Sequence, residues 1–259
     1  MKFGKWLKQQ IEESLPEWRD QFLAYKDLKK LVNLICAAPH LAENAQAEAD
    51  FRYLLNAEMD KFNDFVEEKE EDFIIRQREL QVWLQTINAL LGPNGVRPSG
   101  AEYREEMRKI IKDIVDFHGE MVLLMNYSIV NYTGLSKIAK KYDKRTGRPL
   151  RLPFIKTVLE QPFFTTSMIS KLVKECENTM DAVFPFTEEE ENGNGENYRT
   201  MAVEATEQII FRNTVAALKN MKEMRRTSST YGPLSLPPLN LPEFDFVHSF
   251  QLQSPVSIL

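Results

Sequence analysis

The 259-residue chain is poor in cysteine and glycine and has no long hydrophobic run. Two cysteines are too few for a disulfide framework or a thiolate metal site, so we expect Cys36 and Cys176 to be reduced structural thiols in apolar surroundings. No stretch approaches ~18 consecutive apolar residues, which predicts that no segment spans a membrane. The start, "MKFGKWLKQQ", has neither the apolar core of a signal peptide nor a glycine at position 2 for myristoylation. We expect an intracellular protein, in the nucleus, the cytoplasm or both.

Catalytic signatures are also missing. No Gly-rich phosphate loop, nucleophile motif or metal-ligand spacing occurs, so the sequence predicts no catalytic residue, no metal and no cofactor. Of the three histidines, His40 and His248 stand in a loop and in the tail without candidate ligand partners. His118 lies between Asp116 and Glu120 in "DFHGE", a setting that could serve acid–base chemistry or a metal. Helical periodicity nevertheless places His118 among core residues, and we expect a structural histidine.

No run of strand length alternates between apolar and polar residues, which leaves helix as the expected element. Apolar residues recur at helical spacing in "FGKWLKQQIEESLPEW". Ser14 is the candidate N-cap and Pro16 an early position of a second helix that continues through "FLAYKDLKKLVNLI". The two helices predict an antiparallel hairpin.

Two long helices are expected next. From Asp50 to Leu91 neither proline nor glycine interrupts a helical pattern, and at ~1.5 Å per residue this rod spans roughly 60 Å. "GPNGVRPSG" ends the rod, and a second long helix starts at about Ala101 and runs through "MRKIIKDIVDFHGEMVLLMNYSIVNY". Two long helices joined by one loop predict the core of an antiparallel bundle.

The remainder of the chain predicts further helices and irregular segments. "FFTTSMISKLVKECENTMDAVF" and "YRTMAVEATEQIIFRNTVAALKNMKEM" are helical in pattern, and the acidic segment 186–197 separates them. From Arg225 onward the chain is rich in serine and proline, which predicts a disordered tail. The predicted fold class is therefore all-α.

Positive charge is concentrated in one place although the chain is acidic. It has 33 Lys and Arg residues against 38 Asp and Glu residues, which argues against general attraction to nucleic acid. Yet "KIAKKYDKRTGRPLR", residues 137–151, carries seven basic residues and one acid, Asp143. Four lysines there follow helical spacing and share one face, with Asp143 off that face: Lys137, Lys140, Lys141 and Lys144. Like charges at this spacing repel one another.

Two further basic clusters precede this one: Tyr25, Lys26, Lys29 and Lys30 in "YKDLKK", and Lys2 and Lys5 at the start. If the hairpin packs against the end of the long bundle, the three clusters converge on a patch of ammonium groups and one phenol without a carboxylate. Such a patch suits the phosphate oxygens of a small, densely phosphorylated solute or a phosphate-rich polymer better than the base edges of duplex DNA. The residue pattern alone fits a solvated helix face equally well. RNA and a phosphoinositide membrane surface are the alternative ligands.

Several segments carry a resemblance to a known family. "MKFGKWLKQQ", "PEWRDQFLAYKDLKKLV" and "VDFHGEMVLLMNYSIVNYTGLSKIAKKYDKRTG" resemble the SPX domain, and the match covers residues 1 to about 165. The chain is similar to the standalone plant members of that family, with 166–224 as a C-terminal helical extension and 225–259 as the tail. The resemblance implies a helical hairpin packed on a bundle built around two long helices.

The resemblance also implies a ligand, an inositol polyphosphate such as inositol hexakisphosphate or an inositol pyrophosphate. The phosphate-binding cluster of the family matches Tyr25, Lys29 and Lys141. Its neighbouring lysine cluster matches Lys137, Lys140 and Lys144. Lys2 matches the basic start, and Lys26 and Lys30 are contributors at the rim. Ala139 stands where many members carry a larger aliphatic residue, on the packing side of the helix.

In this subgroup, the loaded domain is similar to a corepressor. It captures MYB coiled-coil transcription factors that drive phosphate-starvation genes, which implies a phosphate-status sensor without direct contact to nucleic acid. A homodimer is compatible with the resemblance, which does not fix the oligomeric state.

Overall fold

The computed structural model describes residues 2–37, 41–89, 101–183 and 209–226, and all regular structure in these ranges is helical. The all-α prediction is confirmed. The predicted acidic segment, the tail beyond Arg226, His40 and His248 lie outside the described residues. The elements in chain order are α1 (Phe3–Glu12), the 3-10 helix η1 (Pro16–Gln21), α2 (Tyr25–Ala37), α3 (Leu41–Ala89), α4 (Ala101–Thr146), α5 (Arg151–Leu159), α6 (Ser167–Val183) and α9 (Ile209–Arg226).

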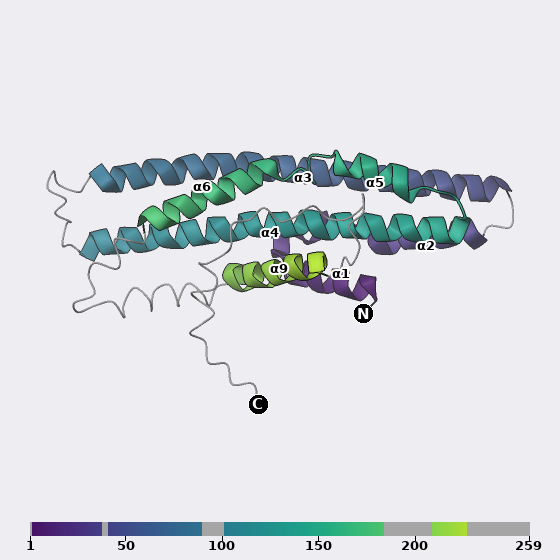
Figure 1. Cartoon of the computed structure of the whole chain (residues 1–259), viewed down its shortest axis with the longest axis horizontal. Helices are drawn as coiled ribbons and strands as arrows, with labels where there is room; N and C mark the ends of the chain where they lie inside the picture. Colours follow the sequence, from purple (N-terminus) through teal and green to yellow (C-terminus); the bar gives the residue numbers. More distant parts are fainter. Residues whose placement is uncertain (1, 38–40, 90–100, 184–208, 227–259) are drawn as a thin grey trace, which may run out of the picture.

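The helices α3 and α4 form the long antiparallel core that the sequence predicts (Figure 1). Phe73 packs against Phe117 with ring centroids 5.7 Å apart, whereas Phe51 stacks on Tyr142 at 5.1 Å. Contacts thus move toward the C-terminal end of α4 as they move toward the N-terminal end of α3. All four rings are buried, so the apolar periodicity of both rods identifies their core faces.

The helix α3 begins at Leu41, nine residues before the predicted start at Asp50. The added segment, "LAENAQAEA", consists mostly of strong helix formers but carries no apolar stripe, so a search for periodicity overlooks it. At ~1.5 Å per residue, the rod is about 74 Å long rather than 60 Å. Its N-terminal end therefore extends past the end of α4 that carries the lysines.

The N-terminal hairpin forms, but its second helix is shorter than predicted. The residue at the N-cap position of η1 is Leu15 and not Ser14, and no side chain caps this helix end. Pro16 occupies the first helical position as expected because its missing N–H has no intrahelical partner there. The continuous second helix predicted from Pro16 is wrong, since η1 stops at Gln21 and α2 starts only at Tyr25.

Side chains of the core explain this interruption. Asn131 on α4 accepts a hydrogen bond from the backbone nitrogen of Leu23 at 2.9 Å, and Glu58 on α3 accepts one from the backbone nitrogen of Ala24 at 2.8 Å. Both nitrogens would otherwise bond within a helix. Tertiary acceptors thus satisfy the backbone at this point and anchor the break to α3 and α4.

The C-terminal end of α4 includes the whole lysine stripe. The helix ends at Thr146, and Gly147 follows with φ of +72°, a conformation that favours glycine. The helix thus stops within "RTGRP", where a glycine and a proline follow the lysine stripe. A short helix that the sequence did not reveal, α5, begins at Arg151. It tolerates Pro153 in its first turn, where a backbone N–H has no intrahelical acceptor.

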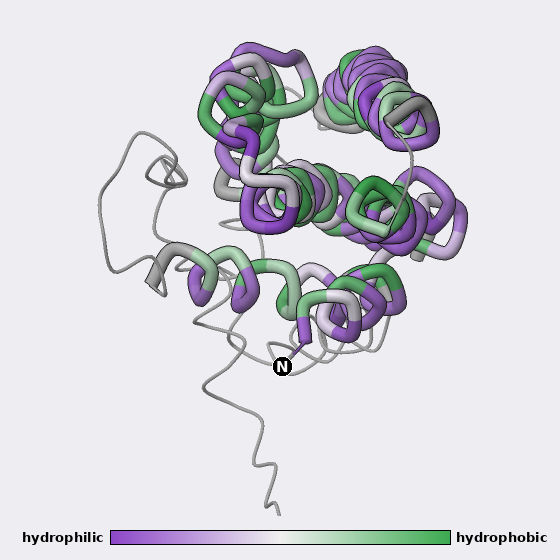
Figure 2. Tube along the Cα trace, turned by 90° about the vertical axis from the view of Figure 1, so that its right-hand side faces the viewer, coloured by the Kyte–Doolittle hydropathy of each residue, from purple (hydrophilic) through white to green (hydrophobic). Residues whose placement is uncertain are grey.

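The last two described helices pack on α4. Gly119 allows α9 to approach closely, because an added β-carbon would lie 2.7 Å from Cγ2 of Ile210 and 2.8 Å from Oγ1 of Thr214. Asn220 on α9 donates to Asn126 at 2.7 Å. The helix α9 extends two residues beyond the predicted end at 224. Figure 2 shows that the packed helices are amphipathic, with hydrophobic residues on one side of a helix and hydrophilic residues on another. The domain boundaries at 165 and 224 remain predictions.

Candidate anion-binding surface

A close approach at Gly134 sets the crossing of the hairpin over α4. A β-carbon added to Gly134 would lie 2.4 Å from Cδ2 of Leu23 and 3.6 Å from Cζ of Phe3. The absence of a side chain therefore lets the buried Leu23 reach the helix surface. Phe3 in turn packs edge-on against Tyr25, with ring centroids 4.8 Å apart. The starts of α1 and α2 thus meet at one place on α4.

Two hydrogen bonds fix how α2 lies along α4. The bond from Leu23, two residues before α2, to Asn131 joins residues 108 positions apart. A bond from Cys36 Sγ to the carbonyl oxygen of Arg145 at 3.6 Å joins residues 109 positions apart. Because this offset is nearly constant, the two helices run parallel with matched rise. Lys29 therefore lies beside the turn of α4 that carries Lys137. Register alone brings the second and third basic clusters together.

The electrostatic environment of Lys141 agrees with this placement. Burial lowers the pKa of Lys141 below its ordinary value, and the positive charges of Lys29 and Arg145 lower it further. Lys141 is half-buried, whereas Lys29 is exposed. Within the described part of the chain, neither lysine takes part in an ion pair. Two ammonium groups without an ion-pair partner thus lie near each other where α2 contacts α4.

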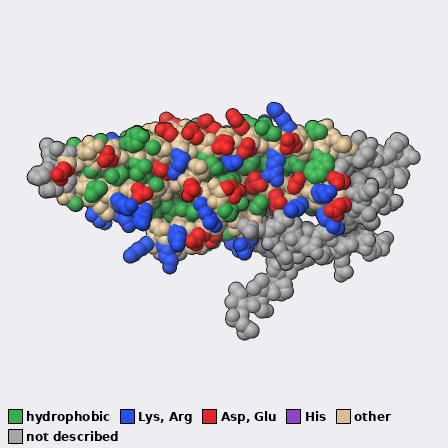
Figure 3. Space-filling model, turned by 180° about the vertical axis from the view of Figure 1, so that it is seen from behind, with side chains coloured by type: hydrophobic (Ala, Val, Ile, Leu, Met, Phe, Trp, Pro, Cys, Tyr) green, Lys and Arg blue, Asp and Glu red, His purple; other side chains and the backbone are tan. Residues whose placement is uncertain are grey.

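The remaining lysines of the stripe are exposed along the same end of α4. Lys137, Lys140 and Lys144 face solvent, and the described residues place no carboxylate in an ion pair with any of them. In Figure 3, Lys and Arg side chains gather at the lower left, the end of the molecule where α1 and the ends of α2 and α4 lie. The stripe is therefore free to contact an anion.

Tyr25 contributes a protonated phenol beside these ammonium groups. Burial raises its pKa above the ordinary value, so the hydroxyl remains a hydrogen-bond donor at physiological pH. Lys2 is exposed and directly precedes Phe3, whose ring contacts Tyr25. Lys5 is exposed one turn further along α1. We call the following set the basic surface: Lys2, Tyr25, Lys29, Lys137, Lys140, Lys141 and Lys144.

Lys26 and Lys30 have a different environment. Lys30 forms an ion pair with Asp27 at 2.6 Å. A hydrogen bond from Lys30 lowers the pKa of Asp27, and the charges of Lys30 and Lys26 act in the same direction. The expectation of a patch without a carboxylate is therefore wrong at this edge. Because Asp27 already neutralises part of the charge, these two lysines lie at a rim rather than among uncompensated cations.

Two other acidic side chains near the basic surface, Asp143 and Glu48, bind groups outside the lysine stripe. Asp143 accepts hydrogen bonds from the backbone nitrogens of Leu150 at 2.7 Å and Arg151 at 3.1 Å, and so joins the end of α4 to α5. Glu48 on α3 accepts a hydrogen bond from Tyr142 at 2.9 Å and pairs with Arg148. Both acids thus fix the last turns of α4 without neutralising the lysine stripe.

One further basic residue, Arg145, lies near the basic surface. Arg145 is exposed and lies close enough to Lys141 to influence its pKa, although the residues predicted from the sequence for this site do not include it. Its position four residues after Lys141 is the signal that could have included it. Arg148, by contrast, pairs with Glu48. We add Arg145 to the candidate contacts.

The thiols and the buried histidine show no catalytic arrangement. His118 is buried as expected, and its Nε2 lies 3.4 Å from Oε1 of Glu177 on α6. Cys176 is buried, and burial raises the pKa of its thiol to about 12. Cys36 is exposed, so the expectation of an apolar environment is wrong for this residue. Among the described residues, no group of three or more His, Cys, Asp or Glu side chains could hold a metal ion.

Comparison with known proteins gives consistent matches. Residues 1–46 and 84–158 match the SPX domain model. The chain is 56% identical over 252 residues to SPX domain-containing protein 3 of Oryza sativa subsp. indica, covering 93% of this chain and 89% of the relative. It is 54% identical over 259 residues to SPX domain-containing protein 3 of Arabidopsis thaliana, covering 100% of both. None of the described helices is long and apolar enough to cross a membrane.

A solved structure of lower similarity is that of the SPX domain of Chaetomium thermophilum glycerophosphodiester phosphodiesterase 1 in complex with inositol hexakisphosphate. It is 21% identical, with a TM-score of 0.49, and the match covers 71% of this chain and 99% of that chain.

Proposed function

Because the chain belongs to the family of SPX domain-containing proteins, we propose that its basic surface binds inositol polyphosphates, with inositol pyrophosphates as the physiological signal of phosphate status. The observation that carries the proposal is the approach of Lys29 to Lys141 without a neutralising carboxylate. Like charges held together by the fold destabilise the free protein slightly, and a bound polyanion removes that cost.

The chemistry of the basic surface fits a small and densely phosphorylated ligand. Lysine ammonium groups are compact donors that can meet phosphate oxygens presented in several directions. The protonated phenol of Tyr25 adds one oriented hydrogen bond. The donors come from the ends of α1, α2 and α4, so one ligand can contact all three elements. The aromatic platforms and base-reading side chains typical of nucleic-acid binders are not prominent among these residues.

We further propose that the loaded protein captures MYB coiled-coil transcription factors and so represses the phosphate-starvation response as a non-enzymatic corepressor. A bound polyanion would reverse the local charge, and a basic partner helix could then approach a surface that repels it in the free state. Ligand and partner would each raise the affinity for the other. Such a role places the protein in the nucleus, the cytoplasm or both.

The test is calorimetric titration of the full chain with inositol hexakisphosphate, followed by competition against two alternative ligands. We expect saturable binding of inositol hexakisphosphate, and displacement by it of any single-stranded RNA or phosphoinositide vesicle that binds. Pull-down of a MYB coiled-coil fragment should require the inositol phosphate. RNA or vesicle binding that inositol hexakisphosphate does not displace would contradict the ligand, and equal pull-down without it would contradict the corepressor mechanism.

A further inference from the structure

The distal half of α3 carries a second, exposed seam beside its core face. Six exposed residues follow spacings of four, three, four, three and four: Glu68, Asp72, Ile75, Glu79, Val82 and Thr86. This spacing is that of the contact positions in a coiled coil, and two of the six residues, Ile75 and Val82, are apolar as such positions require. Ile75 and Val82 are 55% and 62% exposed, whereas core-face residues of the same helix such as Phe73 and Leu80 are buried. We call this set the α3 seam.

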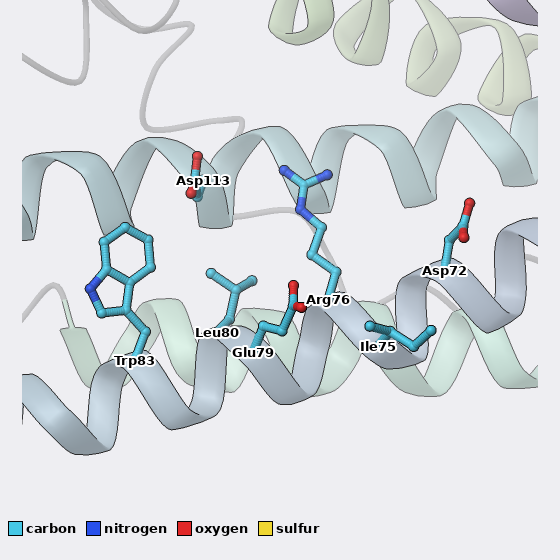
Figure 4. A pocket seen from close by; sticks show the side chains of 7 residues that line it. All are labelled: Asp72, Ile75, Arg76, Glu79, Leu80, Trp83 and Asp113. Atoms are coloured by element: carbon cyan, nitrogen blue, oxygen red, sulfur yellow. The ribbon is translucent and has the colours of Figure 1, made fainter.

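A cavity of about 350 Å³ lies along one side of the α3 seam. Its lining combines a buried leucine, Leu80, with the half-buried indole of Trp83 and residues of the seam. Figure 4 shows Leu80, Trp83 and Arg76 rising from α3 toward α4, where Asp113 lies on the facing helix. Cavities of roughly 300–1,000 Å³ are typical of ligand sites, so this one can accept a large side chain.

The charge of this cavity is negative. Its single cation, Arg76, is already paired with Glu120 at 2.8 Å and lies over the ring of Phe117. The carboxylates of Glu79 and Asp113, in contrast, form no ion pair within the described ranges. Asp and Glu side chains also line the upper edge of the molecule in Figure 3, the edge that α3 forms. An apolar and cationic group would complement both properties of the cavity.

From these observations, we propose that the α3 seam and its cavity are a docking site for a basic amphipathic α-helix of a partner protein. Apolar residues of that helix would cover Ile75, Val82 and Trp83, and a flanking Lys or Arg would reach Glu79 and Asp113. A second copy of the chain fits less well, because it would bring the same carboxylates against one another. The seam lies on the distal part of α3, far from the lysines at the end of α4, so this site is independent of inositol phosphate binding.

The probe is a synthetic helix of about 28 residues, long enough to be stable. It carries Leu at alternating spacings of three and four, which match the α3 seam, and Lys on both sides of this Leu stripe. Two matched peptides separate the apolar contribution to binding from the electrostatic one. Ala replaces Leu in the first peptide, and Glu replaces Lys in the second. Calorimetry uses the full chain without inositol phosphate. We expect saturable binding of the Leu/Lys peptide, at least tenfold weaker binding of the Ala/Lys peptide, and no binding of the Leu/Glu peptide. No binding of the Leu/Lys peptide would overturn the proposal.

Two pairs of charge reversals locate the site. Glu79→Lys with Asp113→Lys should weaken binding of the Leu/Lys peptide at least tenfold. The control pair, Asp60→Lys with Glu67→Lys, makes the same change in net charge at exposed positions of α3 that lie about a third of a turn around the helix from Glu79. The control should change the affinity less than twofold. Equal loss in both pairs would overturn the proposal, because general electrostatic attraction would then explain binding.

Variants of the apolar residues provide a test that does not depend on charge. Ile75→Ser with Val82→Ser alters only exposed side chains, so folding should be retained and circular dichroism can verify this. We expect at least fivefold weaker binding of the Leu/Lys peptide. Sedimentation of the unmodified chain completes the test. A dimer that these two substitutions dissociate would overturn the proposal in favour of a second copy as the occupant.

Discussion

Lys29 on α2 and Lys141 on α4 lie close enough for the charge of one to act on the pKa of the other. Burial lowers the pKa of Lys141 first, and the charge of Lys29 lowers it further. The two residues are 112 positions apart in sequence, and the parallel register of α2 with α4 brings them together. No acidic side chain of the described part of the chain pairs with either.

Removal of Lys29 should stabilise the free protein. Lys29→Ala removes a like-charge repulsion that solvent screens, because Lys29 is exposed and Lys141 only half-buried. Such a repulsion is worth about 0.3 kcal/mol, so the melting temperature should rise by roughly 1 °C at low salt. Thermal unfolding in low and high salt measures this effect. Lys26→Ala on the same helix is the matched control. It removes an attraction to Asp27 and should lower the melting temperature slightly. A decrease for both variants would contradict the proposed repulsion.

The stabilisation by Lys29→Ala should decrease as the pH rises. The pKa of Lys141 in the folded state is lower than its ordinary value of 10.5. At a pH between the lowered and the ordinary pKa, the folded chain therefore binds fewer protons than the unfolded chain. The repulsion is fully present below the lowered pKa and disappears as Lys141 loses its proton. The stabilisation by Lys29→Ala should therefore be largest near neutral pH and vanish as the pH approaches 10.5. A gain that grows with pH would contradict this assignment.

Gly134→Ala should weaken ligand binding without contacting the ligand. The new methyl group would lie 2.4 Å from Leu23, which forces the start of α2 away from α4. Overpacking of this kind typically costs about 1–3 kcal/mol, partly offset by the better helix propensity of alanine. Gly119→Ala is the matched control, since it overpacks α4 against α9 instead. Titration with inositol hexakisphosphate should show lower affinity for the first variant only. Equal affinity loss would indicate general destabilisation.

Affinity for inositol hexakisphosphate should fall steeply as salt rises, because the basic surface is exposed to the screening ions. Titrations at several salt concentrations measure the slope. Lys137→Ala with Lys140→Ala should make the dependence shallower, since fewer cations then contribute. A salt-independent affinity of the unmodified chain would contradict an electrostatic site.

The sequence predicts the helices well where apolar spacing is regular, as at Phe51 and Phe73 on the core face of α3. It misplaces the start of that helix at Asp50, because an alanine- and glutamate-rich segment is helical without an apolar stripe. It also misses the interruption before Tyr25. There, side chains that are distant in sequence supply the hydrogen-bond acceptors, and no local pattern encodes them.

For the candidate site too, the sequence predicts what depends on local spacing and misses what depends on contacts between distant residues. Helical spacing alone places Lys137 and Lys141 on one face of a helix, and the structure has them on the last turns of α4. Local spacing cannot show that Lys29 joins them, because the register depends on the contact of Leu23 with Gly134. The resemblance to the SPX family groups these residues at the sequence level, and the geometry supplies the physical reason for their proximity.

The most direct test of the central proposal is calorimetric titration of Tyr25→Phe/Lys29→Ala/Lys141→Ala with inositol hexakisphosphate. Lys156→Ala/Lys174→Ala, which removes two exposed lysines of α5 and α6, is the control for net charge. We predict that the triple variant loses affinity at least tenfold, about 1.4 kcal/mol or more, with its helical content unchanged. The control variant should bind like the unmodified chain. Unchanged affinity of the triple variant would contradict the assignment of the basic surface as the inositol polyphosphate site.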